Sequence, residues 1–96
     1  MKNYEIMYIL RADLDETARK EALEAVNAIL TNNGAKINSV DEKMGLRELA
    51  YPINDETKGY YVVLKVSADS KALNEFNRLV SINRTVLRHL VLVDEQ

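Results

Sequence analysis

The sequence predicts an α+β domain in which two helices cover one face of a four-stranded antiparallel sheet. Apolar residues recur at helical spacing in two segments, 13–34 and 69–80, and four other segments have the patterns of strands. Their order along the chain is strand, helix, strand, strand, helix, strand. Right-handed crossovers then place the first and third strands in the centre of the sheet and the second and fourth at its edges. This arrangement is the split βαβ, or ferredoxin-like, sandwich.

The first strand and first helix have clear signals. Residues 4–10 carry apolar side chains on both faces, as is usual for a central strand. Asp13 stands three residues before Glu16, which is the spacing of a capping box and predicts where the helix begins. Asn33-Gly34 predicts where it ends, because Gly readily takes the left-handed conformation found after many helices. The buried side of this helix is an apolar stripe: Ala18, Ala22, Leu23, Val26, Ile29 and Leu30.

Residues 35–51 are predicted to form one long bent strand. Gly45 lacks a Cβ and suits a bulge, where the ladder changes register. Pro52 has no N–H to donate, so it belongs on an edge strand or at the end of a strand. Side chains alternate between the two faces of a strand, so Leu46 lies on one face and Leu49 on the other. The other face carries Arg47, Leu49, Tyr51 and Ile53.

The second half of the chain repeats the strand and helix signals. Residues 54–59 have the composition of a turn, so the third strand, 60–66, is expected to return antiparallel. Asp69 is predicted to cap the second helix, and the last strand covers residues 86–93. The inner face of the second helix is Leu73, Phe76, Leu79 and Val80.

The face of the sheet opposite the helices is predicted to be more apolar than a solvated sheet needs, which indicates a partner surface or a nucleic-acid platform. Residues 58–65 begin like the third strand of an RNA-recognition motif. Tyr61, Val62 and Lys65 then depart from that pattern, so stacking of bases on the sheet is not favoured. The side chains expected on this open face are Met7, Ile9, Tyr61, Val63 and Lys65.

Composition limits the class of protein. The 96 residues suffice for a single domain, residues 1–96, and the absence of Cys excludes disulfides and thiolate metal sites. The net charge of −2 argues against a nucleic-acid binder that acts alone. The short, interrupted apolar run at the start is neither a signal peptide nor a membrane span, so a cytoplasmic protein without membrane contact is expected.

Residues suited to catalysis are scarce. His89 is the only histidine, and it has neither ligand companions at metal spacing nor a nucleophile as partner. The carboxylates of Asp13, Asp15 and Glu16 are explained by helix capping and the helix dipole. The three glycines are isolated, so no phosphate-binding loop is present in the sequence. The sequence therefore predicts a protein that is not an enzyme and uses no metal, cofactor or small-molecule substrate.

Three stretches together resemble a known family. Residues 45–54 have the sequence Gly-Leu-Arg-Glu-Leu-Ala-Tyr-Pro-Ile-Asn, which resembles the hallmark of protein six of the bacterial small ribosomal subunit. Residues 4–10 resemble the first strand of that family, and Asn83 with residues 86–91 resembles its last. The resemblance covers the whole chain in order and at matching separations. It implies the ferredoxin-like fold and a structural role in the ribosome.

The resemblance also implies partners. The family binds the central domain of small-subunit ribosomal RNA as a heterodimer with a small basic protein, protein eighteen of the same subunit. We therefore expect the isolated chain to bind this RNA poorly and the heterodimer to bind it well. The expected RNA contacts are the cations of outer elements: Lys2, Arg47, Arg84 and Arg88. The expected partner contacts are Leu46, Leu49 and Tyr51, because an outer strand can accept a strand or loop from another chain.

An alternative from a different class remains open at this stage. The low basicity and the apolar open face would also suit a homodimeric ferredoxin-like sensor or small enzyme. Such a protein would cover the open face with a second copy of itself and hold a ligand between the subunits. The hallmark stretch favours the ribosomal interpretation.

Overall fold

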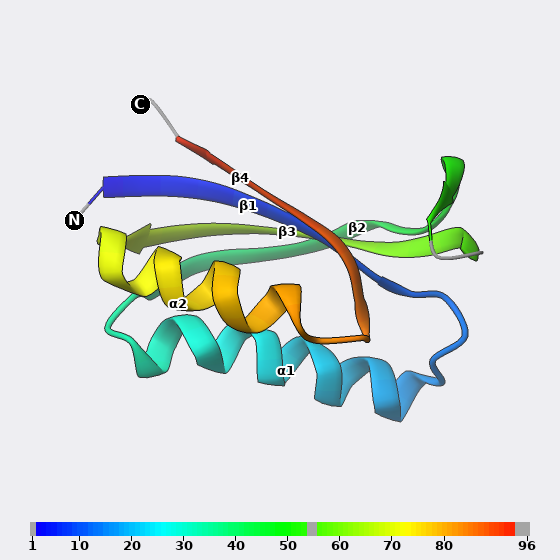
Figure 1. Cartoon of the computed structure of the whole chain (residues 1–96), viewed down its shortest axis with the longest axis horizontal. Helices are drawn as coiled ribbons and strands as arrows, with labels where there is room; N and C mark the ends of the chain where they lie inside the picture. The colour runs from blue at the N-terminus through cyan, green and yellow to red at the C-terminus, as the bar shows by residue number, and fades with distance from the viewer. Residues whose placement is uncertain (1, 54–55, 94–96) are drawn as a thin grey trace.

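The computed structural model describes residues 2–53 and 56–93. The elements are β1 (Lys2–Arg11), α1 (Glu16–Asn32), β2 (Lys36–Ile53), β3 (Glu56–Ala68), α2 (Ser70–Ser81) and β4 (Val86–Val93). The four strands form one antiparallel sheet in the order β2-β3-β1-β4, and both helices lie on the same side of it (Figure 1). The predicted order of elements, the two central strands and the two edge strands are therefore confirmed.

The core lies between the sheet and the helices. Strand alternation in β1 and β3 turns the even-numbered side chains toward the helices, and burying each large one contributes roughly 1.5–3 kcal/mol. The same alternation leaves the odd-numbered side chains on the open face. The fully buried side chains include Ile6, Tyr8, Leu10, Val26, Leu30, Val62, Leu64, Val66 and Phe76.

The helix ends confirm two of the three predictions about where the helices begin and end. Asp69 accepts a hydrogen bond from the backbone N–H of Ala72 at 2.9 Å, and Gly34 follows α1 with a φ of 88°. The prediction that Asp13 caps α1 is wrong. Asp15 is the N-cap instead, because its side chain accepts the N–H of Ala18 at 2.7 Å.

β2 is a long bent strand, as predicted. Asp41 lies opposite Val63, but Gly45 lies opposite Tyr61, so four steps along β2 match only two along β3. Gly45 sits at this bulge with a φ of 57°, a left-handed conformation that a residue without a Cβ adopts at little cost. The register also shifts between Ile37 and Ser39 and between Glu48 and the end of the strand.

The turn after β2 is shorter than predicted. The segment 56–59 was expected to lie in the turn, but it belongs to β3 and pairs with β2, with Lys58 opposite Glu48. Cross-strand pairing therefore overrides the turn composition of these residues. The rest of the predicted turn, residues 54–55, lies outside the described residues. The paired ends of β2 and β3 form an arm, hereafter the hairpin arm (residues 45–53 and 56–61). It extends past the helices, and its β2 end rises on the side of the sheet away from them (Figure 1).

Candidate nucleic-acid and partner interface

A hollow of about 400 Å³ lies on the open face of the sheet. Every strand contributes to it, and most of its lining is apolar or aromatic. The odd-numbered alternation of β1 and β3 supplies three members that the sequence had placed on this face, Met7, Ile9 and Tyr61. The remaining lining side chains on the open face are Leu49, Tyr51, Arg88 and Leu90.

Arg88 and Tyr51 meet at the rim of this hollow. β2 and β4 are the opposite edges of the sheet, and three strand spacings separate flat edges by roughly 14 Å. The guanidinium carbon of Arg88 nevertheless lies 5.6 Å from the centre of the Tyr51 ring. The Nη1 group of Arg88 also donates a hydrogen bond to the Tyr51 hydroxyl. The hairpin arm must therefore fold over the open face to bring the two residues together.

The other hallmark residues divide between the two faces of β2. Arg47 lies opposite Gly59, is exposed, and its Nε donates a hydrogen bond to the backbone oxygen of Met44 at 2.8 Å. It shares the face of Leu49, as the alternation predicts. Leu46 lies opposite Tyr60 on the other face and is 56% exposed. The structure brings Leu49 and Tyr51 into the hollow and leaves Leu46 outside it.

Three of the four predicted RNA contacts, Lys2, Arg47 and Arg84, do not line the hollow. Lys2 is exposed at the far end of β1, opposite Ala68. It precedes Ile9 by seven residues, or roughly 23 Å of extended strand. Arg84 is exposed just before β4 and lines a second hollow. Of the four predicted RNA-contacting cations, only Arg88 lines the first hollow, together with Leu49 and Tyr51.

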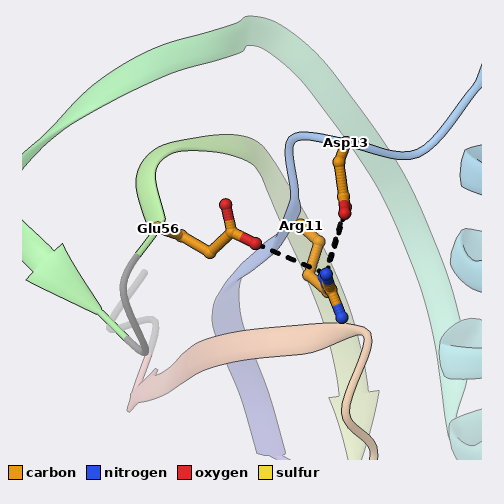
Figure 2. Close-up of polar contacts among 3 residues, drawn as sticks. All are labelled: Arg11, Asp13 and Glu56. Carbon is orange, nitrogen blue, oxygen red and sulfur yellow. Dashed lines mark hydrogen bonds and ion pairs between the residues drawn. The ribbon is translucent and has the colours of Figure 1, made fainter.

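The second hollow contains a cation that the sequence analysis did not single out. Arg11 lies between two carboxylates, with its Nη2 2.8 Å from an oxygen of Asp13 and 3.5 Å from an oxygen of Glu56 (Figure 2). These contacts join the end of β1 to the start of β3. Each is partly exposed, so each contributes at most about 1 kcal/mol. No sequence pattern points to Arg11, because Glu56 is remote along the chain.

Leu90 and Leu92 are further open-face residues that the sequence analysis missed. Leu90 lies opposite Met7, and the two leucines are 47% and 50% exposed. A signal was available, because alternation within residues 86–93 places both on the face of Arg88. These side chains continue the apolar surface along β4.

His89 lies on the opposite face of β4, against the helices. Its ring meets the edge of Phe76 at 5.9 Å between ring centres and an angle of 85°. Burial lowers the pKa of His89, so the neutral imidazole predominates at pH 7. The ring of His89 packs against Phe76 of α2, although His89 is also one of the residues that line the hollow.

Within residues 2–53 and 56–93, no group of three His, Cys, Asp or Glu side chains is placed to hold a metal ion. No helix in the part of the chain that the structure describes has the length and apolar character to cross a membrane.

Comparison with known proteins identifies the family. A profile described as ribosomal protein S6 matches residues 3–92. The small ribosomal subunit protein bS6 of Shouchella clausii is 54% identical over 96 residues, which is the full length of both chains. The protein of the same name from Halalkalibacterium halodurans is 53% identical, again over the full length of both. The crystal structure of 30S ribosomal protein S6 from Thermotoga maritima is 26% identical and superposes with a TM-score of 0.89 over 97% of this chain and 87% of that one. The chain therefore belongs to the ribosomal protein S6 family and is a structural, non-enzymatic protein of the ribosome in the cytoplasm.

Proposed function

We propose that this protein binds the central domain of small-subunit ribosomal RNA as a heterodimer with small-subunit protein eighteen. The observation that carries the proposal is the hollow on the open face, where apolar side chains of all four strands lie beside the guanidinium of Arg88. The apolar part suits contact with a protein, and the arginine at its rim suits contact with phosphate. One surface thus offers both kinds of contact side by side.

The charge of the chain explains why a protein partner is needed. With 13 basic and 15 acidic residues the net charge is −2, so the chain alone gains little from releasing the counterions of RNA. A basic partner docked in the hollow would supply the missing positive charge. It would also fix the two surfaces relative to each other before the RNA arrives, which lowers the cost of binding.

The proposed contacts follow the positions of the side chains. Leu49 and Tyr51 contact the partner from within the hollow, and Leu46 contacts it from the other face of the same edge strand. Arg88 contacts phosphate at the rim of the hollow. The other proposed phosphate contacts are Lys2, Arg47 and Arg84, all exposed.

RNA titrations test the proposal. A transcript of the central domain is titrated with the chain alone, with protein eighteen alone, and with an equimolar mixture. We expect tight binding only by the mixture. Equal RNA affinity of the chain with and without protein eighteen would contradict the heterodimer.

A matched pair of arginine variants then tests the site. Arg88→Ala should lower the salt dependence of heterodimer binding by about one unit of slope, because one phosphate contact is lost. Arg78→Ala is the control, since Arg78 lies on α2 and pairs with Glu75 at 2.8 Å. It should leave the slope unchanged. An unaltered slope in Arg88→Ala would remove Arg88 from the RNA contacts.

Of the homodimeric alternative, only the self-association of the chain still needs a test. A sensor or enzyme disagrees with membership of a structural ribosomal family, but self-association through the apolar open face is a separate question. Analytical ultracentrifugation of the purified chain decides it. We expect a monomer without protein eighteen. A stable dimer that protein eighteen fails to dissociate would mean that a second copy occupies the proposed partner site.

A further inference from the structure

We infer that Tyr51 is a positioning residue for Arg88, so that the tip of the hairpin arm determines where an RNA-contacting guanidinium lies. The inference rests on the proposed function, because it assigns a purpose to a contact within the same site. It adds a second role to Tyr51, which the proposed function treats only as a contact to the protein partner.

The geometry shows how Tyr51 restrains Arg88. The phenol ring lies 5.6 Å from the guanidinium carbon, and the hydroxyl accepts a hydrogen bond from Nη1 of Arg88. A contact to the ring together with one to its oxygen leaves the guanidinium less freedom than either contact alone. A free arginine side chain has much rotamer entropy to lose on binding, and a restrained one loses less.

The chemistry of the restraint distinguishes Arg88 from Arg11 and Arg78, the two arginines of the described residues that form ion pairs. Arg11 and Arg78 are held by carboxylates, which neutralise their charge. Tyr51 holds Arg88 through a phenol ring and its hydroxyl, and not through a carboxylate. The contact therefore does not form an ion pair with the guanidinium. A guanidinium has five N–H donors, and the hydrogen bond to Tyr51 uses one of them. The other donors include pairs with the fork geometry that phosphate accepts.

The position of Tyr51 also connects the two proposed binding partners. Tyr51 lies at the end of a bent edge strand and lines the hollow proposed for the protein partner. A partner that packs against its ring limits the motion of Tyr51 and, through it, of Arg88. Binding of the partner then improves binding of RNA, and by linkage RNA improves binding of the partner by the same factor.

The first experiment measures Arg88 in the chain alone. The ¹⁵N relaxation of the Arg88 Nε–H group reports the order of its side chain. Tyr51→Leu, which removes both contacts, should lower that order. Tyr61→Phe makes a hydroxyl deletion in the same hollow and should leave it unchanged. Equal order of Arg88 in the wild-type chain and in Tyr51→Leu would overturn the inference without bearing on RNA binding.

The second experiment measures RNA affinity of the heterodimer at saturating partner, with the central-domain transcript as probe. Tyr51→Phe keeps the ring and deletes the oxygen, so it should weaken binding about two- to fivefold. In an Arg88→Ala background the same substitution should change nothing, because its target is gone. A third background is Arg88→Lys, which keeps the positive charge but not the planar guanidinium. In that background too, Tyr51→Phe should have little effect on RNA affinity.

The outcomes separate the two claims. Failure of the wild-type heterodimer to bind the transcript would overturn the proposed function and this inference with it. Binding that depends on Arg88, but with the same loss from Tyr51→Phe in every background, would overturn only the positioning role. The positioning role would also be overturned if Tyr51→Phe did not change RNA affinity in the wild-type background. Tyr51 is 54% exposed, so its substitution is not expected to prevent folding.

Discussion

The hydroxyl of Tyr8 in the centre of the sheet donates a hydrogen bond to the side-chain oxygen of Asn27 on α1, with 3.2 Å between the oxygens. Tyr8 is fully buried, so its hydroxyl would lack a solvent partner if Asn27 were absent. This bond is a polar link within an otherwise apolar layer. It connects α1 to the central strand β1.

The first prediction concerns the strength of this link. Tyr8→Phe removes the hydroxyl and should lower the free energy of unfolding by about 1 kcal/mol, the usual net value of one hydrogen bond. Asn27→Ala leaves the buried hydroxyl without its partner and should cost more, about 1–3 kcal/mol. Urea unfolding at pH 7 measures both. Additive losses in the double variant would show that the two residues do not interact.

The second prediction concerns alkaline pH. Burial, with a smaller contribution from the charge of Glu42, raises the pKa of Tyr8 above its ordinary value of 10.0. The unfolded chain therefore loses this proton at lower pH than the folded chain. The stabilisation is complete below the unfolded pKa of about 10 and is lost as pH rises toward the folded value. Above about pH 10, urea unfolding should show the wild-type chain losing stability faster than Tyr8→Phe. Parallel pH profiles would contradict this.

The third prediction concerns mild acid. Burial lowers the pKa of His89 from 6.5, so protons bind the unfolded chain more readily than the folded one. This stabilisation is present above the unfolded pKa and is lost as pH falls below it. Wild-type stability should therefore begin to fall as pH drops below about 6.5, ahead of most carboxylates. His89→Gln should flatten that part of the profile. His89 is the only histidine of the sequence. If the pH dependence persists in His89→Gln, a group other than a histidine must cause it.

The fourth prediction separates two aspartates at the start of α1. Asp15→Ala should cost about 1 kcal/mol, because its side chain accepts the N–H of Ala18. Asp13→Ala should cost less than about 0.5 kcal/mol, because it removes only an exposed ion pair with Arg11. Urea unfolding of the two variants gives the comparison. A greater loss of stability in Asp13→Ala than in Asp15→Ala would indicate that Asp13 is the cap.

The fold was accessible from the sequence because its signals are local. Alternation in residues 4–10 and 60–66 shows which side chains face the helices, and Gly45 marks the bend of β2. The start of α1 was harder, because Asp13 and Asp15 both precede it and the spacing to Glu16 favoured the wrong one. In the folded chain Asp13 accepts a hydrogen bond from Arg11, which leaves Asp15 as the cap of α1. The sequence pattern does not show this contact.

The site was less accessible because it depends on contacts between distant residues. Tyr51 and Arg88 are 37 residues apart and lie on opposite edges of the sheet. The two residues meet because several register shifts together bend β2 over the open face. The periodicity of the sequence does not predict the total bend. For the same reason the segment 56–59 looked like a turn. Its extended conformation comes from pairing with β2 and not from its own composition.

The last prediction concerns Gly59, which lies in the hairpin arm and pairs with Arg11 of β1. A Cβ at this position would collide with Cγ2 of Ile9 and lie 3.3 Å from Cδ2 of Leu49. Ile9 is only 4% exposed and both side chains line the hollow, so neither can move away freely. Gly59→Ala should therefore cost about 1–3 kcal/mol, as overpacking usually does.

A double variant tests whether crowding is the cause. Ile9→Ala removes the atom with which the new methyl group collides, so Gly59→Ala should cost much less in that background. Urea unfolding of the wild-type chain, the two single variants and the double variant gives the coupling energy. If Gly59→Ala costs the same with and without Ile9, the penalty comes from the backbone. The close approach of the hairpin arm to β1 would then not be what requires glycine at this position.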